Sequence, residues 1–127
     1  MKKAIVTDKA PKAIGPYSAG IETENMIFTS GQLGIDPEAG KLVTGGIEAE
    51  TKQALINLKA VLEAGGSNLS LVVKTTVFLR DISEFAKMNS IYAEFFNQIP
   101  PARSAFQVAA LPLGAAVEIE AVALKNN

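Results

Sequence analysis

The sequence predicts an α+β fold: one mixed sheet of about six strands with two long helices on one of its faces. Two long segments carry apolar residues at three- and four-residue steps, and shorter segments between and around them are rich in β-branched residues. The chain has 127 residues, which fits a single domain over residues 1–127. Its apolar fraction of 48% is at or above the usual share, so we expect the uncovered face of the sheet to need a partner subunit.

The first third of the chain is predicted to contain strands and turns. Residues 4–6 form a short apolar strand, and residues 19–23 and 26–30 form a hairpin whose turn is Glu24-Asn25. Residues 36–40, Asp-Pro-Glu-Ala-Gly, are typical of a turn, because proline presets φ and glycine supplies the positive φ that closes it.

Two segments are predicted to be helices. Residues 47–64 carry an apolar stripe, and Gly65-Gly66 supplies the stop. Ser83 is the expected N-cap of the second helix, and Pro100-Pro101 must end it because proline cannot continue the ladder. The stripe of the second helix comprises Phe85, Met88, Tyr92, Phe95, Phe96 and Ile99.

Three more strands are predicted, at residues 71–80, 103–109 and 116–124. In the first, alternation places Val73, Thr75, Val77 and Leu79 on one face and Val72, Lys74, Thr76, Phe78 and Arg80 on the other. In the last two, Arg103, Ala105 and Gln107 share one face, as do Glu118, Glu120 and Val122. If these two strands pair with each other, Arg103 and the carboxylates approach each other.

The composition limits the chemistry. The chain has no cysteine and no histidine, which excludes disulfides, thiolate nucleophiles and imidazole acid–base catalysis. No clustered acidic pattern suggests a metal site, so we expect no metal. Twelve basic and thirteen acidic residues give a net charge of −1 with no basic stripe, so a nucleic-acid partner is not expected. No signal peptide or membrane-spanning run is recognised, and a cytoplasmic protein is the default expectation.

Arg103 is the strongest candidate for binding a ligand. It is one of only two arginines, and it lies where the second helical pattern has ended and a strand begins. Its planar, permanently charged fork suits a small carboxylate or phosphate. A salt bridge to Glu118, Glu120 or another acid is an equally good interpretation of the sequence alone.

Glu120 is the best general-base candidate in a chain without histidine. It lies inside an otherwise apolar strand, where a buried unpaired charge is costly, so it needs either a charged partner or a water to orient. The competing interpretation, which the residues alone favour modestly, is that both glutamates form the solvated face of an edge strand.

Further candidates could line a pocket. Tyr17 offers a ring and a hydroxyl in a Gly-Pro-Tyr-Ser turn, and Ser30-Gly31 offers a hydroxyl and a backbone that a ligand can approach closely. Asn89 lies off the apolar stripe of the second helix. Loop packing, a plain strand end and a surface position explain these three features about equally well or better.

Several motifs together resemble the RidA (YjgF) family of reactive intermediate/imine deaminases over essentially the whole chain. They occur in the family's order and spacing: Ile14-Gly15-Pro16-Tyr17-Ser18, Ser30-Gly31-Gln32, Val73-Lys74-Thr75-Thr76-Val77-Phe78-Leu79, Pro101-Ala102-Arg103-Ser104 and Val117-Glu118-Ile119-Glu120-Ala121. The combination is specific, although each motif alone is weak.

The resemblance implies a chorismate-mutase-like subunit assembled as a homotrimer with three clefts between subunits. It implies cofactor-free and metal-free hydrolysis of 2-aminoacrylate and 2-aminocrotonate, which pyridoxal-phosphate enzymes release, to 2-keto acids and ammonia. In the family, the arginine that matches Arg103 binds the substrate carboxylate, and the glutamate that ends Glu-Ile-Glu, here Glu120, is associated with the attacking water. The family's other site residues match Tyr17, Ser30-Gly31 and, less securely, Asn89.

One position departs from the family pattern. Many members carry cysteine two residues after the arginine, where this chain has Ala105. Thiol-dependent behaviour of relatives therefore does not carry over, whereas imine hydrolysis needs no thiol. Two other functions remain alternatives: the RNA-cleaving or translation-inhibiting activity ascribed to some relatives, and a trimer that senses keto acids without turnover.

Overall fold

The computed structural model describes residues 1–126. It contains a main sheet, a separate hairpin, two helices and three short 3₁₀ turns. The strands of the main sheet are β1 (Lys3–Ile5), β2 (Gly20–Glu22), β3 (Met26–Thr29), β4 (Gln32–Leu33), β7 (Val72–Leu79), β8 (Ala102–Gln107) and β9 (Val117–Leu124). The hairpin is β5 (Ile35–Asp36) and β6 (Lys41–Leu42), the helices are α1 (Gly46–Ala64) and α2 (Phe85–Phe95), and the turns are η1 (Leu69–Leu71), η2 (Ile82–Glu84) and η3 (Pro112–Gly114).

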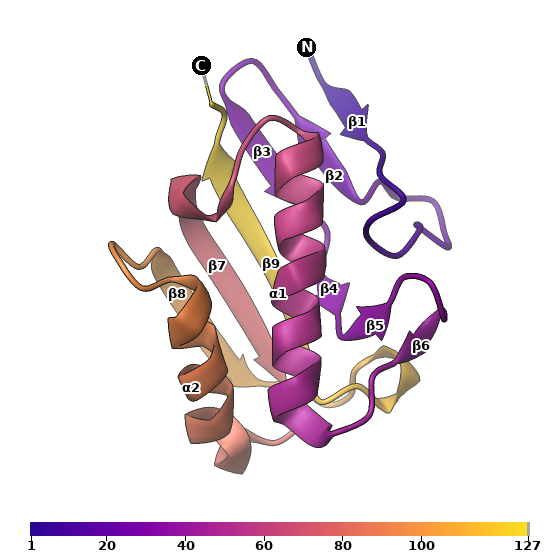
Figure 1. Cartoon of the computed structure of the whole chain (residues 1–127), viewed down its shortest axis with the longest axis vertical. Coiled ribbons are helices and arrows are strands. Elements are labelled where there is room, and N and C mark those ends of the chain that lie inside the picture. The colour runs from indigo at the N-terminus through magenta and orange to yellow at the C-terminus, as the bar shows by residue number, and fades with distance from the viewer. Residues whose placement is uncertain (127) are drawn as a thin grey trace.

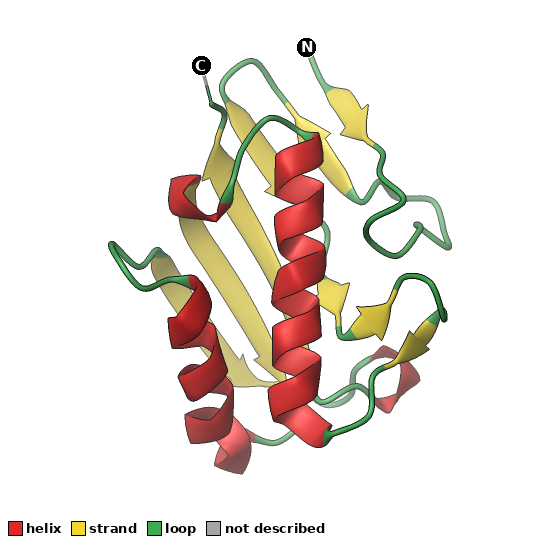
Figure 2. Ribbon diagram, viewed as in Figure 1, coloured by secondary structure: helices red, strands yellow, loops and turns green. Residues whose placement is uncertain are grey.

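The two helices cover one face of the sheet, as Figures 1 and 2 show. The strand order is β1-β2-β3-β9-β7-β8, with β4 beside β9. Only β7 and β8 pair in parallel, and α2 connects them, as a parallel pair requires a crossover. The predicted α+β fold with a mixed sheet and two helices on one face is therefore confirmed.

The core lies between α1, α2 and the facing side of the sheet. The predicted stripe of α1 is buried along its length: Ile47, Ala54, Leu55, Leu58, Val61 and Leu62. Alternate residues of β9 face it: Val117, Ile119, Ala121 and Ala123, each at most 3% exposed. The helix ends at the predicted glycine pair, where Gly66 has a positive φ of 85°.

The other face of the sheet has no helix over it. Phe28, Phe106 and Leu124 are 44–45% exposed, and Phe106 packs edge-on against Phe78 with ring centroids 5.5 Å apart. Exposed apolar side chains on a sheet face are typical of a surface that another chain covers. This is the face for which the sequence predicted a partner subunit.

The second helix differs from its prediction at both ends. Asp81 caps the preceding turn, because its carboxylate accepts hydrogen bonds from both the N–H and the hydroxyl of Ser83. The expected N-cap at Ser83 was therefore wrong. The helix ends at Phe95, several residues before the two prolines, and Ile99 lies beyond it with 92% of its surface exposed.

Strand β7 does not alternate as predicted at its start. Val72 is buried and Val73 is 40% exposed, the reverse of their expected faces, because a β-bulge between Val72 and Lys74 shifts the register against β9. From Thr75 to Leu79 the predicted alternation is confirmed.

The main sheet has one strand more than the six predicted. Ser30 and Gly31 interrupt the segment after β3, so the chain pairs with β9 twice, first through β3 and then through β4. The predicted turn at residues 36–40 closes the β5–β6 hairpin, with Gly40 at a φ of 70°.

Candidate functional site

The β7–α2–β8 unit positions Arg103 beneath α2. Arg103 is paired in register with the buried Thr75 of β7, and both side chains lie on the helix side of the sheet. The neighbouring Ser104 lies on the other side, where its hydroxyl accepts a hydrogen bond from Lys74 Nζ at 3.0 Å. The alternation predicted for β8 is therefore confirmed around Arg103.

Residues of α2 hold the Arg103 guanidinium. Its Nη1 donates a hydrogen bond of 2.7 Å to Oδ1 of Asn89, and its Cζ lies 4.8 Å from the ring centroid of Tyr92 and 5.3 Å from that of Phe85. Asn89 is thus a direct partner of Arg103 and not merely a surface residue.

No carboxylate neutralises Arg103 within residues 1–126. The two ion pairs there are Lys87–Glu84 and Lys125–Glu22. The salt-bridge interpretation of Arg103 is therefore wrong within the described residues. A guanidinium has five N–H donors, and the one bond to Asn89 leaves donors available for an anion.

Glu118 and Glu120 lie on the opposite face of the sheet from Arg103. Glu120 is paired with Thr76 on the uncovered face, and β7 separates β9 from β8. The expectation that the last two strands pair and bring Arg103 to the glutamates within one chain was wrong. The edge-strand interpretation was also wrong, because β9 lies inside the sheet between β3 and β7.

The gap between β3 and β4 lies beside Glu118. A Cβ atom built on Gly31 would collide with the Glu118 carboxylate, so another residue at this position would push that carboxylate away from the backbone. Beside the gap, the hydroxyl of Thr29 accepts a hydrogen bond of 3.0 Å from the backbone N–H of Ala121. The interruption in the ladder thus brings a carboxylate against the half-buried backbone of the Ser30-Gly31 pair.

Burial, and secondarily the charge of Glu120, raises the pKa of Glu118 above its ordinary value of 4.5. A carboxyl group with a raised pKa exchanges protons more readily near neutral pH, as a general base or acid requires. The prediction from the sequence named Glu120 as the base and not Glu118, although both lie on one face of β9. Gly31, directly before β4, was the available signal in the sequence, since a glycine can mark a place where another group approaches the backbone closely.

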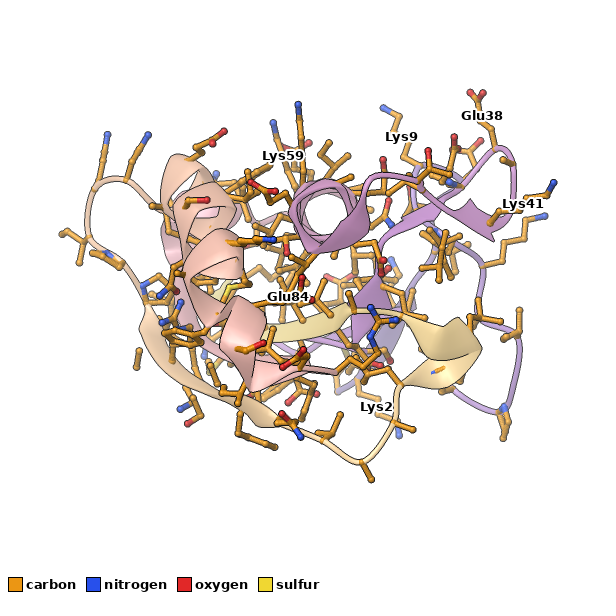
Figure 3. The ribbon with its side chains drawn as sticks, turned by 90° about the horizontal axis from the view of Figure 1, so that it is seen from below. Lys2, Lys9, Glu38, Lys41, Lys59 and Glu84 are labelled. Carbon is orange, nitrogen blue, oxygen red and sulfur yellow. The ribbon has the colours of Figure 1, made fainter. Side chains whose placement is uncertain are left out.

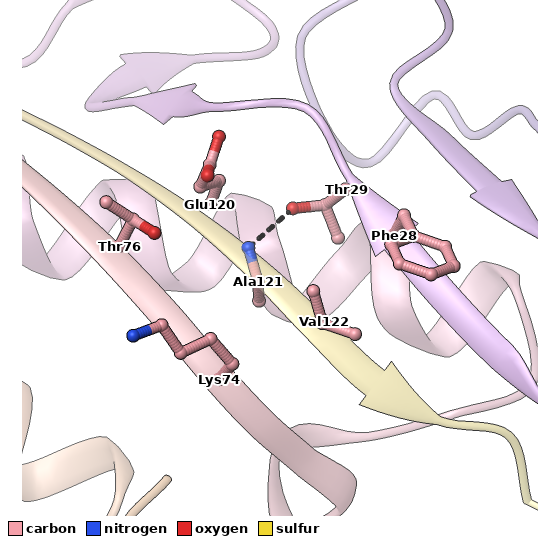
Figure 4. A pocket seen from close by; sticks show the side chains of 7 residues that line it. All are labelled: Phe28, Thr29, Lys74, Thr76, Glu120, Ala121 and Val122. Atoms are coloured by element: carbon pink, nitrogen blue, oxygen red, sulfur yellow. Dashed lines mark hydrogen bonds between the residues drawn. The ribbon is translucent and has the colours of Figure 1, made fainter. Parts of the chain in front are cut away.

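Glu120 lines a shallow hollow of about 120 Å³ on the uncovered face. Figure 4 shows the side chains of β3, β9 and β7 around it. Lys74 and Thr76 contribute polar groups, and Phe28 and Val122 contribute apolar walls.

Tyr17 and Ser30 lie together on the other side of the molecule from Arg103. The hydroxyl of Ser30 donates a hydrogen bond of 2.6 Å to the carbonyl of Ser18, next to Tyr17. Tyr17 is 51% exposed, and its hydroxyl accepts a hydrogen bond of 3.4 Å from the backbone N–H of Ile14.

The predicted site residues therefore fall into two groups. Arg103 and Asn89 lie at the β8–α2 edge, whereas Tyr17, Ser30, Gly31 and the two glutamates lie around β2, β3, β4 and β9. In Figure 1 the β1–β2 loop and the α2–β8 edge are on opposite sides of the molecule. One chain alone does not bring all of these residues into one pocket.

Charged side chains are spread over the surface. Figure 3 shows Lys59 pointing away from α1 and Lys41 and Glu38 projecting from the β5–β6 hairpin. No helix within residues 1–126 is long and apolar enough to cross a membrane. In the same part of the chain, no three acidic side chains gather in a way that could hold a metal ion.

The family model described as Endoribonuclease L-PSP matches residues 7–125. The chain belongs to this family, also called RidA or YjgF. A mouse protein named 2-iminobutanoate/2-iminopropanoate deaminase is 51% identical over 126 residues, which cover 99% of this chain and 93% of the mouse protein. The resemblance found in the sequence is therefore confirmed.

Solved structures of RidA family members share the fold. The E. coli YjgF gene product is 44% identical with a TM-score of 0.93, and the comparison covers 98% of this chain and 99% of that structure. E. coli TdcF with bound serine is 38% identical with a TM-score of 0.94 over the same shares of the two chains.

Proposed function

We propose that this protein hydrolyses small 2-imino acids, which form from 2-aminoacrylate and 2-aminocrotonate, to 2-keto acids and ammonia. The observation that carries the proposal is Arg103, a guanidinium that α2 holds in place and that no carboxylate of residues 1–126 neutralises. Relatives named as imine deaminases that are about half identical over nearly the whole chain support the same reaction.

In this proposal Arg103 binds the substrate carboxylate. A guanidinium forms two parallel charge-assisted hydrogen bonds with a carboxylate, which fixes the orientation of the attached carbon. The imine carbon is the neighbour of that carboxylate, so anchoring one group positions the other for attack. The structure of E. coli TdcF with bound serine is consistent with a site that accepts a small amino acid.

A carboxylate then activates water. Glu118 is the group we favour, because its raised pKa and its close approach to the Gly31 backbone suit proton transfer at this position. It takes a proton from water as the oxygen attacks the C=N carbon, and the resulting carbinolamine loses ammonia once its nitrogen is protonated. Water and the imino acid thus become one keto acid and one ammonia. Glu120, the residue to which the sequence analysis gave this role, is the alternative.

We further propose that the site forms between subunits of a homotrimer. The Arg103 group and the Glu118 group occupy different parts of the chain and opposite faces of the sheet. A head-to-tail ring joins one surface of each subunit to a different surface of the next. Such a ring supplies Arg103 and Asn89 from one chain and Glu118, Ser30 and Gly31 from its neighbour, and it covers the exposed aromatic side chains of the open face.

The remaining candidates have supporting roles in the proposal. Gly31 allows the substrate close to the backbone, and Ser30 holds the preceding loop through its bond to Ser18. Tyr17, whose ring is half exposed, closes one side of the cleft. We also keep the predictions of one domain over residues 1–127, a cytoplasmic location, no metal or cofactor, and a functional link to pyridoxal-phosphate enzymes.

The reaction is tested by coupling the protein to a dehydratase that generates 2-aminoacrylate and timing the release of keto acid. We expect faster release with the wild type and much weaker acceleration with Arg103→Ala. Glu118→Gln and Glu120→Gln form a matched pair, and the larger loss identifies the base. An Arg103→Ala variant that equals the wild type would contradict the proposal.

The shared site is tested by mixing inactive subunits. Arg103→Ala and Glu118→Gln chains, unfolded together and refolded at equal concentration, combine one intact half-site from each. Random assembly of a head-to-tail ring gives about one quarter of the wild-type activity, because a quarter of the interfaces receive both intact halves. A mixture no more active than the separate variants would show that the site does not cross subunits in this way.

RNA cleavage is the second candidate function, because the matching family model is described as an endoribonuclease. The net charge of −1 and the scattered lysines argue against a phosphate-backbone surface. Salt-sensitive RNA binding that survives repurification and disappears in Arg103→Ala would favour it. Tight keto-acid binding without faster imine loss would favour a sensing trimer instead.

A further inference from the structure

Tyr92 has no role in the mechanism above, yet it contacts the residue on which that mechanism depends. It belongs to the apolar stripe of α2 and is 6% exposed, as a core residue would be. Its ring, however, lies next to the Arg103 guanidinium, and its hydroxyl lies 2.7 Å from that of Thr75. Leucine would fill the core without either interaction, and phenylalanine would keep only the contact between its ring and the guanidinium.

The three residues form a compact unit across two elements. Thr75 and Arg103 are register partners on the adjacent strands β7 and β8, and Tyr92 comes from α2 above them. Thr75 is fully buried, so its hydroxyl needs a partner, and the tyrosine hydroxyl provides one. Burial raises the pKa of Tyr92 above its ordinary value of 10.0, which keeps the phenol neutral. The ring is therefore anchored at its hydroxyl end as well as by packing.

A fixed ring restricts Arg103. The arginine lies on β8, an edge strand, and a long side chain there has many rotamers to lose when it binds a ligand. A guanidinium is attracted to the face of an aromatic ring, most strongly where water is excluded. Tyr92 stacks beside the guanidinium while Asn89 binds one of its N–H groups, so the fork is held before any substrate arrives. Preorganisation of this kind lowers the cost of binding.

We propose that Tyr92 is a positioning residue, which acts through its ring to hold the Arg103 guanidinium in the orientation that receives a substrate carboxylate, with Thr75 anchoring the ring. This inference rests on the proposed function for its consequence in turnover. The contact between Tyr92 and Arg103 can be measured without any turnover.

The direct measurement uses the fact that the chain has only two arginines. In protein labelled with ¹⁵N-arginine, the Nε–H groups of Arg103 and Arg80 give two NMR signals, and Arg80 serves as the internal control. We expect the Arg103 signal of the wild type to be shifted by the ring current and to show contacts with the Tyr92 ring protons. In Tyr92→Leu it should move toward the position of a free arginine, while the Arg80 signal stays in place.

The functional measurement compares three variants. Tyr92→Leu should raise the Kd of a 2-keto acid, and the KM of the imine, by about threefold to thirtyfold, the range that cation–π strengths imply, with kcat within about twofold of the wild type. Tyr92→Phe keeps the ring and should rescue most of this loss. Phe96→Leu is the matched control, because Phe96 packs 4.7 Å from the Tyr92 ring within the core, so this change should lower stability and leave KM unchanged.

The outcomes separate this inference from the proposed function. A wild type without ring contacts at the Arg103 signal overturns the inference, even if every Tyr92 variant fails to fold. A folded Tyr92→Leu variant with unchanged Kd and unchanged NMR signal also overturns it, as does a Tyr92→Phe variant as impaired as Tyr92→Leu. If the wild type shows no imine hydrolysis, the proposed function fails, while the NMR signals and keto-acid binding still test the role of Tyr92.

Discussion

Replacing Arg103 with alanine should lower kcat/KM for 2-imino acids by about two orders of magnitude. Asn89 occupies one N–H group of the guanidinium, and the others are free to make two hydrogen bonds to the substrate carboxylate. Charge-assisted hydrogen bonds contribute roughly 1.5–3 kcal/mol each. Two such bonds contribute about 4.5 kcal/mol in the middle of this range. If water replaces about a third of this in the variant, about 3 kcal/mol is lost, which corresponds to a factor of about 150.

The structure also predicts how lysine should behave at this position. Lysine keeps the positive charge but has no planar fork, so it cannot bind the carboxylate and Asn89 in the same way. We expect Arg103→Lys to lose about tenfold in kcat/KM, between the wild type and alanine. Both variants lose the stacked contacts with Tyr92 and Phe85, so we expect a free energy of unfolding lower by about 1–2 kcal/mol.

The assay is steady-state keto-acid release at several concentrations of the imine-generating enzyme, with folding checked by circular dichroism. Arg80→Ala is the matched control, because Arg80 is the other arginine and its Nη1 binds the carbonyl of Gly114, away from the proposed site. Its kcat/KM should stay within about twofold of the wild type. A folded Arg103→Ala variant within threefold of the wild type would refute the carboxylate clamp.

Two further predictions concern buried polar groups. Because burial raises the pKa of Glu118, the folded chain holds that proton more tightly than the unfolded chain, and the stability this confers at low pH is lost as pH rises through the folded pKa. Glu118→Gln should therefore raise Tm at pH 7 while abolishing turnover. The gain in Tm should shrink below about pH 4.5, where the glutamate is protonated in the unfolded chain as well. Thermal melts in which the gain in Tm does not depend on pH would contradict this. Thr75→Val should lower the free energy of unfolding by about 1–3 kcal/mol, because it leaves the Tyr92 hydroxyl unpaired. Adding Tyr92→Phe should recover much of this loss. If urea unfolding shows that the two substitutions have additive effects, the direct hydrogen bond is contradicted.

The elements whose form depends on local sequence could be predicted well. Helix α1 follows from an apolar stripe with a glycine stop, the β2–β3 hairpin from a polar turn between two apolar runs, and the β5–β6 turn from its proline and glycine. Each of these signals acts over a few residues, so no distant contact has to be known. The predictions were wrong where the local conformation depends on a strand that is distant in the sequence. The bulge at Val73, for example, depends on the register of β7 against β9.

For the candidate site too, local features could be predicted and contacts between distant strands could not. The sequence alone singled out Arg103, Asn89, Gly31 and a glutamate of β9, because residue type, spacing and family resemblance are local properties. It placed Arg103 next to the glutamates, although β7 lies between their strands. The β7–α2–β8 order could have indicated a parallel pair, since two parallel strands need such a crossover.

Tertiary structure alone decided on which side of the sheet each group lies and which carboxylate is desolvated. Alternation relates residues within one strand, but only the strand order shows that Arg103 is under α2 while Glu118 and Glu120 are on the uncovered face. The two glutamates are equivalent in the sequence pattern. They differ in the fold because the backbone at Gly31 packs against one of them, and burial of a charge depends on what surrounds it and not on its place in the chain.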